Sequence, residues 1–191
     1  MLVIWPTIFA EAYPVAGADT AYLDRLLRAL ADRMTGAEVA AINAQQRNPF
    51  PPADPLHARW YPFDPSQWRI PARPLPPSYR DFLLWSDGGS FRTGERRFDA
   101  FLPVGKLREY LLAYHVPQFM PGGLPFAMDG GGGFYLFDLR ADSIDGEYPI
   151  VFAHAGNLGW DDAVPIAQTF PDACRGDTDP RSRDAVREFS F

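Results

Sequence analysis

The sequence predicts a folded chain that combines helices with a series of short β-strands. Hydrophobic residues make up 47% and aromatic residues 15% of the 191 residues, which is enough to bury a core. Apolar residues at helical spacing recur in several stretches of the first 115 positions, and short apolar runs separated by turn residues dominate the rest. The length fits one domain, or one domain with an extension.

Two helices are expected near the N-terminus. Asp19 or Thr20 caps the first, because apolar residues at helical spacing follow. These apolar residues are Leu23, Leu26, Leu27, Leu30 and Met34. Thr35 and Glu38 have the spacing of a capping box, which predicts a second helix that ends before Pro49.

A proline-rich segment follows. Residues 49–77 hold ten of the twenty prolines, which disfavour regular helix and central strand. Aromatic residues are interspersed with them: Phe50, Trp60, Tyr61, Phe63 and Trp68. We expect a meandering segment held over the core by these rings, because a free linker would be poor in aromatic residues. A proline-rich ligand for another domain is the alternative.

The next helix is expected to start at Pro77, a residue suited to a first helical position. Its buried face would carry Tyr79, Phe82, Leu83 and Ser86, and Asp87-Gly88-Gly89 would end it. A strand is expected within residues 96–104 and a helix over Pro103–Tyr114, with Leu107, Tyr110, Leu111 and Tyr114 buried. Four more strands are expected, at Leu124–Met128, Phe134–Leu139, Tyr148–Ala153 and Val164–Thr169.

The four consecutive glycines Gly130–Gly133 raise the question of a phosphate-binding loop. A Walker loop needs a lysine and a hydroxyl residue after its last glycine, but Phe134 and Tyr135 stand there. The dinucleotide-binding motif needs a glycine at the position of Tyr135 and a helix afterwards, whereas a strand is expected here. The glycines are therefore interpreted as a hairpin corner that requires positive φ and close backbone approach.

Several sequence blocks, in this order and spacing, resemble the SUKH superfamily. They are LPPSYRDFLLWSDGG (75–89), LPFAMDGGGGFYLFDL (124–139), YPIVFAHAG (148–156) and AVPIAQTF (163–170). That superfamily contains the fungal cell-wall assembly regulator domain and many bacterial immunity proteins. The resemblance implies an α+β domain with a mainly antiparallel sheet flanked by helices. It also implies a role in binding rather than catalysis, with bacterial members acting as antidotes that contact a toxin.

The resemblance also suggests a division of the chain into three parts. Residues 1–66 would form the helical pair and the Pro/aromatic-rich extension packed on the core. Residues 67–175 would form the SUKH-like α+β domain, and residues 176–191 a polar surface tail, because Asp and Arg alternate with small residues there.

Charge and composition limit the partners. The net charge of −6 and the pI of about 5.0 provide no global basic field for nucleic acid or anionic lipid. No apolar run approaches the roughly 20 residues of a membrane span, and Pro6 interrupts a short apolar start that lacks the basic region of a signal peptide. With Cys174 as its only cysteine, the chain suits a reducing cytoplasm.

Little in the sequence indicates catalysis, a cofactor or a metal. His57, His115 and His154 lie in different expected elements without zinc-ligand spacing, and no G-x-S-x-G motif is present. Cys174 would be a nucleophile only beside a histidine, and an inert cysteine is the favoured interpretation.

The candidate partner-binding residues are acidic and aromatic: Asp138, Asp142, Asp145, Glu147, Trp160, Asp161 and Asp162. A calcium loop is excluded because Arg140 stands where an oxygen ligand belongs. These residues have the composition of an acidic face that attracts a basic protein, such as a nuclease toxin, and anchors it through Trp160. Three alternatives remain: a solvated acidic turn, an enzyme that combines this turn with His154, and an adaptor that docks through the proline-rich segment.

Overall fold

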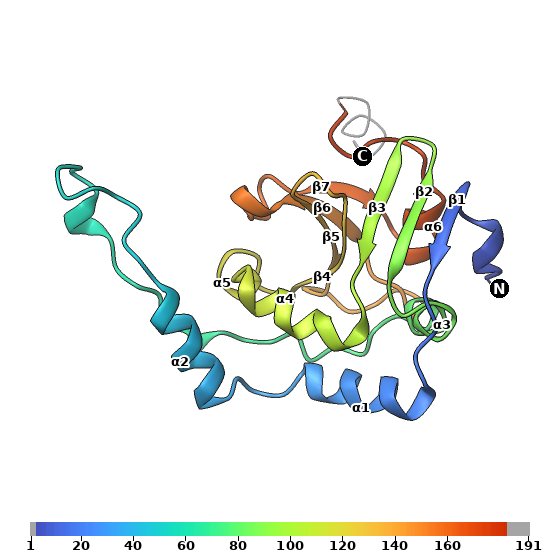
Figure 1. Ribbon diagram of the computed structural model, residues 1–191, viewed down its shortest axis with the longest axis horizontal. Coiled ribbons are helices and arrows are strands. Elements are labelled where there is room, and N and C mark those ends of the chain that lie inside the picture. The colour runs from blue at the N-terminus through green and yellow to red at the C-terminus, as the bar shows by residue number, and fades with distance from the viewer. Residues whose placement is uncertain (1–2, 183–191) are drawn as a thin grey trace.

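The structure, a computed structural model, describes residues 3–182. The described part of the chain forms one seven-stranded sheet in which every neighbouring pair is antiparallel and the strands follow chain order (Figure 1). Its strands are β1 Glu11–Pro14, β2 Gly89–Thr93, β3 Arg96–Phe101, β4 Gly123–Met128, β5 Gly133–Asp138, β6 Ile150–His154 and β7 Val164–Ala167. With the helices around this sheet, the predicted α+β fold is confirmed.

Helices cover both faces of the sheet. The helices of residues 3–182 are α1 Thr20–Leu30, α2 Gly36–Gln45, α3 Pro77–Trp85, α4 Leu107–Ala113, α5 Val116–Phe119 and α6 Phe170–Arg175, and of these α2 lies away from the sheet (Figure 1). On one face, Tyr79 of α3 and Phe170 of α6 pack against Phe137 of β5, with ring centroids 5.0 and 5.8 Å from it. On the other face, Tyr114 beyond α4 packs against Phe134, 4.7 Å away. Because β5 is buried on both faces, its sequence is a continuous apolar run instead of an alternating one.

The N-terminal residues complete the core. Trp5 and Phe9 are 4% and 7% exposed, and their rings lie 5.2 Å from Phe82 and 4.6 Å from Phe91. The chain then enters β1, which pairs with β2 although three helices separate the two strands in sequence. The sequence did not predict β1 or β2, and it placed the first strand at residues 96–104.

The helix caps are as predicted. Asp19 accepts a hydrogen bond from the backbone N–H of Tyr22 at the start of α1, and Thr35 and Glu38 form a complete capping box at the start of α2. The helix expected from Pro103 begins as a 3-10 turn at Val104–Lys106 and continues as α4. Its buried face includes Leu112, whereas Tyr114 is 37% exposed.

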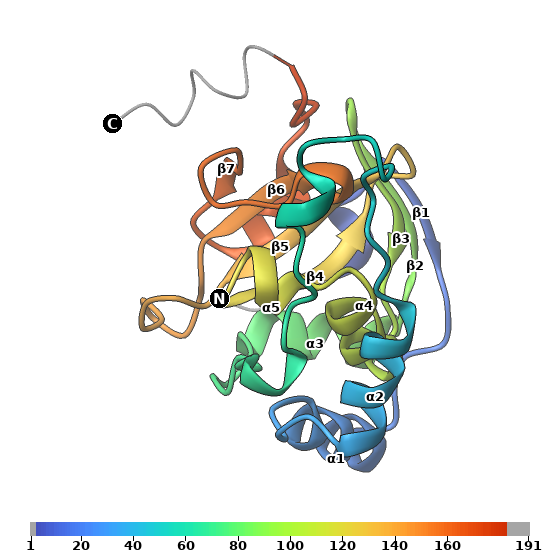
Figure 2. The same cartoon turned by 90° about the vertical axis from the view of Figure 1, so that its left-hand side faces the viewer.

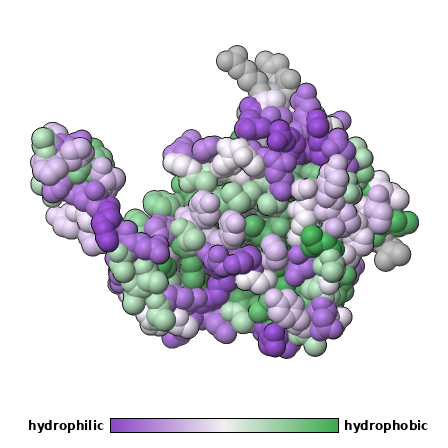
Figure 3. Space-filling model, viewed as in Figure 1, coloured by the Kyte–Doolittle hydropathy of each residue, from purple (hydrophilic) through white to green (hydrophobic). Residues whose placement is uncertain are grey.

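The chain between α2 and residue 63 forms an arm that stands away from the body in Figure 1 and lies in front of the sheet when that side faces the viewer in Figure 2. The Gln46 side chain closes its base by donating to the carbonyl of Phe63 at 2.9 Å and accepting from its N–H at 2.8 Å. Phe63 and Trp68 pack on His115, whereas Tyr61 is 78% exposed. Figure 3 shows the arm as a separate lobe with hydrophobic and hydrophilic residues intermixed.

The segment after α6 crosses the β2–β3 hairpin. The carbonyl of Asp177 accepts hydrogen bonds from the N–H groups of Glu95 and Arg96, at 2.7 and 3.1 Å. The Arg96 side chain is 3% exposed and donates to the carbonyls of Ala173 and Thr178. Residues 176–182 of the expected surface tail are thus tied to the sheet, and residues 183–191 lie outside the described part.

Candidate functional site

The glycine corner joins β4 to β5 and uses its own carboxylate as a cap. Asp129 Oδ1 accepts hydrogen bonds from the N–H groups of Gly131 and Gly133, at 2.8 and 2.7 Å, and Asp129 is 4% exposed. Gly130 and Gly132 adopt φ values of +74° and +89°. Because the carboxylate already binds the amides that an anion would need, the corner is a structural turn and confirms the hairpin interpretation.

The other end of β5 carries a fixed arginine–tryptophan pair. The Arg140 guanidinium binds both oxygens of Asp138, with Nε–Oδ1 and Nη2–Oδ2 distances of 2.9 and 2.7 Å. Its Cζ lies 3.7 Å from the centroid of the Trp160 ring. Trp160 Nε1 donates to the carbonyl of Pro121 at 3.2 Å, so hydrogen bonds orient both members of the stack. The hydrogen bonds that Arg140 donates to Asp138 also raise the pKa of Arg140.

Two predicted carboxylates, Asp161 and Asp162, directly follow Trp160 in the chain. Asp161 is exposed and forms no hydrogen bond or ion pair with any residue of the described range 3–182. Asp162 accepts a hydrogen bond from Asn157 at 2.9 Å, a neutral partner that leaves the negative charge uncompensated. We call Asp138, Arg140, Trp160, Asp161 and Asp162 the Trp160 surface.

The remaining candidate carboxylates have other surroundings. Asp142 forms an ion pair with Arg73, which also donates from Nε to the carbonyl of Leu139 at 2.9 Å. Glu147 joins two helices, because it accepts hydrogen bonds from Ser78 at the start of α3 and from the N–H of Phe170 at the start of α6. Asp145 is exposed in the same loop at a φ of +53°. Asp142 and Glu147 are therefore already engaged within the chain.

The structure separates His154 from the acidic turn. Gly133 pairs with His154 and Phe137 with Ile150, so His154 lies at the glycine end of the β5–β6 pair, roughly 15 Å along the strands from Asp138. His154 Nδ1 accepts a hydrogen bond from the N–H of Gly156. The proposed acid–histidine constellation is therefore not assembled in the described structure.

The other two side chains considered as reactive groups, Cys174 and His115, are fully or partly buried. Cys174 is fully buried, and burial raises the pKa of its thiol well above the ordinary value. His115 packs against Phe63 and Trp68, and burial lowers its pKa. Among residues 3–182, no three His, Cys, Asp or Glu side chains are grouped to hold a metal ion. The same residues contain no helix with the length and hydropathy to cross a membrane.

Sequence reasoning missed Arg140 and Arg73 as organisers of this region. Arg140 was noted only as the residue that breaks a calcium loop, yet it lies two positions after Asp138, within reach of that carboxylate. Arg73 lies in the proline-rich segment, far in sequence from Asp142, so no local pattern indicates their pairing.

The fold is an α+β domain: an antiparallel sheet whose strands follow chain order, with helices on both faces. One end of β5 carries the glycine corner capped by Asp129, and the other end carries the Arg140–Trp160 stack. Residues 72–175, more than half of the chain, match the model of the SMI1 / KNR4 family (SUKH-1), and the chain belongs to this family. The match includes β2 to β7, whereas β1, α1, α2 and the arm precede it. No curated protein matches the chain.

Proposed function

We propose that this chain is a non-enzymatic protein-binding module of the cytoplasm that neutralises a toxin domain by direct contact. The observation that carries the proposal is the Trp160 surface. Tryptophan and arginine are the residues most often found at the energetic centre of protein interfaces. Here both are held in place before a partner arrives, which reduces the entropy lost on binding.

The charge around this surface favours a basic partner. Asp161 and Asp162 are exposed beside Trp160, and the chain carries a net charge of −6. Carboxylates at the rim of an interface increase the association rate with a positively charged protein, and the increase falls with ionic strength. An enzyme that acts on nucleic acid has such a basic surface. A nuclease toxin is therefore the partner that we propose.

The test is a pull-down of the full chain from cells that produce it, followed by a binding measurement with the toxin domain that it recovers; recovery of no toxin domain would overturn the proposal. Trp160→Ala is expected to weaken the complex by roughly 2 kcal/mol, about thirtyfold in Kd, because it removes the aromatic anchor. A double Asp161→Asn, Asp162→Asn variant is expected to slow association at low salt and to leave the dissociation rate nearly unchanged. Asp81→Asn, which removes an exposed carboxylate from α3, serves as the matched control.

The same measurement decides between this surface and the arm. The adaptor alternative is favoured by one observation, the exposure of Tyr61 on a segment that projects from the body (Figure 3). A chain in which a short glycine linker replaces residues 49–61 keeps Gln46 and Phe63, the residues that close the base of the arm. If this chain folds and loses the partner while Trp160→Ala binds normally, the arm is the docking surface and our proposal is wrong.

A further inference from the structure

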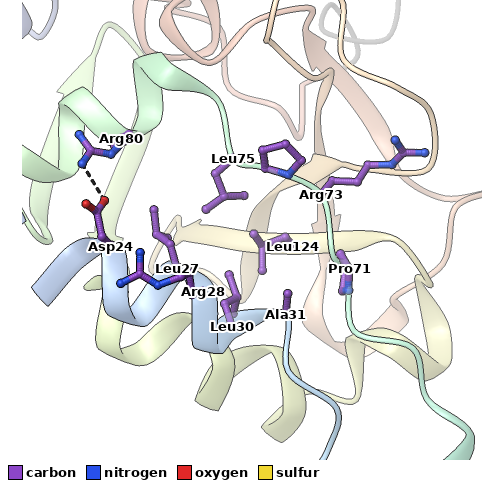
Figure 4. A pocket seen from close by; sticks show the side chains of 11 residues that line it. Asp24, Leu27, Arg28, Leu30, Ala31, Pro71, Arg73, Leu75, Arg80 and Leu124 are labelled. Carbon is purple, nitrogen blue, oxygen red and sulfur yellow. Dashed lines mark hydrogen bonds and ion pairs between the residues drawn. The ribbon is translucent and has the colours of Figure 1, made fainter. Parts of the chain in front are cut away.

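A groove lies between α1, the start of α3 and the extended segment 71–75 (Figure 4). Its volume is about 310 Å³, at the lower end of the roughly 300–1,000 Å³ that is typical of ligand sites. Its floor is apolar: Leu124 of β4 is 1% exposed, and Leu27 and Leu75 are partly buried above it. The floor therefore offers a surface for one or two aliphatic side chains.

The groove is bordered by positive charge. Arg28, Arg73 and Arg80 line it, with Asp24 as the only carboxylate among its lining residues. Asp24 forms an ion pair with Arg80 at 2.7 Å. The guanidinium of Arg73 points out of the groove toward Asp142 and the carbonyl of Leu139 (Figure 4).

Arg28 differs from the other two arginines. Across residues 3–182, its guanidinium has no hydrogen bond, ion pair or ring contact. It lies beside the Asp24–Arg80 pair, next to the apolar floor (Figure 4). An unpaired guanidinium next to an apolar surface is suited to a ligand that carries a carboxylate close to an aliphatic group.

We propose that this groove binds an acidic linear segment of a partner protein. One aliphatic side chain of the segment contacts Leu27, Leu75 and Leu124, and a neighbouring carboxylate binds Arg28. A linear segment fits because the apolar floor lies between charged borders, with Arg28 and Arg80 on one side and Arg73 on the other (Figure 4). Because Arg80 is paired with Asp24 and Arg73 with Asp142, the unpaired charge at the groove is that of Arg28, which is opposite in sign to the chain's net charge and favours an acidic ligand locally.

This inference goes beyond the proposed function, because the Trp160 surface attracts a basic partner and the groove an acidic segment. Arg73 lines the groove, pairs with Asp142 on the β5–β6 loop and donates to the carbonyl of Leu139, the residue between Asp138 and Arg140 of the Trp160 surface. A single partner with neighbouring basic and acidic regions would contact both. Each surface can nevertheless be tested alone, since Arg28 and Trp160 share no contact in the described structure.

The probe is a fluorescently labelled eight-residue peptide with one leucine flanked by two glutamates, and anisotropy measures its binding to the full chain at low salt. A second peptide carries glutamines in place of the glutamates. We expect the glutamate peptide to bind more tightly and Arg28→Gln to weaken its binding roughly fivefold, the effect of losing one solvent-exposed ion pair. Arg25→Gln, on the same helix but outside the groove, is the matched control and is expected to bind as the unchanged chain does.

A second variant tests the floor independently of charge. Ala31→Phe places a ring in the groove without removing a core side chain, and thermal unfolding verifies that it folds. It is expected to abolish peptide binding, whereas Trp160→Ala is expected to leave it unchanged even if it prevents toxin binding. Equal affinity for the two peptides, or an equal loss in Arg28→Gln and Arg25→Gln, would overturn the proposal.

Discussion

At the scale of single residues, Asp129 determines the glycine corner. Its carboxylate accepts two backbone hydrogen bonds in a site that is 4% exposed. Asp129→Ala would leave the N–H groups of Gly131 and Gly133 without that acceptor. We expect this change to lower the free energy of unfolding by about 2–4 kcal/mol, since buried amides that lose a charged partner are costly. Urea unfolding followed by tryptophan fluorescence measures the loss.

The control for this prediction is Asp161→Ala, an exposed carboxylate without a described partner, which is expected to change stability by less than about 0.5 kcal/mol. An equally small effect at Asp129 would show that the glycines hold the corner without the cap. The sequence predicted the corner from its glycines, but it did not reveal that the Asp129 carboxylate accepts hydrogen bonds from the amides of the corner. That role depends on how the turn closes in space, and an aspartate before a glycine also fits an ordinary turn.

At the scale of elements, the junction of α1, α2 and α4 is held by Arg108. Its guanidinium binds both oxygens of Glu38, at 2.7 and 3.0 Å, and donates to the carbonyls of Leu30, the last residue of α1, and Asp32, between α1 and α2. The hydrogen bond from Arg108 lowers the pKa of Glu38 from 4.5 to about 2. Because the pKa is lower in the folded state, the stability it contributes is present above pH 4.5 and is lost as the pH falls toward 2.

We therefore expect Glu38→Gln to reduce the free energy of unfolding by roughly 1–2 kcal/mol at neutral pH, after allowance for solvent screening, and by almost nothing near pH 2. Denaturant unfolding at a series of pH values measures the difference. Glu109→Gln on α4 removes a carboxylate with an exposed lysine partner and is expected to leave the shape of the pH profile unchanged. A constant difference between Glu38→Gln and the unchanged chain at every pH would contradict the prediction.

The elements that the sequence predicted are those with their own local signal. The strands β4 to β7 are apolar runs between turn residues, and α1 and α2 have capping residues. In contrast, all four residues of β1 are exposed and one is Pro14, so this strand exists only through its pairing with β2. The missed helix α6 did carry a signal, because Thr169 accepts a hydrogen bond from the N–H of Asp172 in the spacing of a capping box.

The sequence proposed the residues of the candidate site, and it did not indicate how they are arranged in space. Trp160 and Asp138 were expected on one surface, and Arg140 links them. Glu147 was included with them because it is close in sequence, yet it caps α6 and contacts α3. Proximity along a loop does not specify which side chains turn toward the core, and that is determined by long-range packing.

At the scale of the whole molecule, the stability of the region matched by the family model depends on residues that precede it in the chain. Trp5 and Phe9 lie among Phe82, Phe91 and Phe170, and β1 covers the edge of β2. Truncating one large buried ring costs about 3–5 kcal/mol, so losing two is comparable to the roughly 5–15 kcal/mol of a typical domain. We therefore expect a fragment of residues 67–175 not to fold.

The measurement is thermal unfolding with near-ultraviolet circular dichroism of this fragment, beside a chain that ends at residue 182. The longer chain keeps Trp5, Phe9, β1 and the Asp177 contacts to the β2–β3 hairpin, and is expected to unfold cooperatively. The Phe9→Ala variant of the longer chain is expected to remain folded with a lowered unfolding temperature, because one ring is lost instead of two and the strand pairing persists. Cooperative unfolding of residues 67–175 at the temperature of the longer chain would show that these residues form an independent domain and that the N-terminal segment adds nothing to its stability. If the fragment fails to fold while Phe9→Ala remains folded, β1 and the N-terminal rings are part of the domain itself.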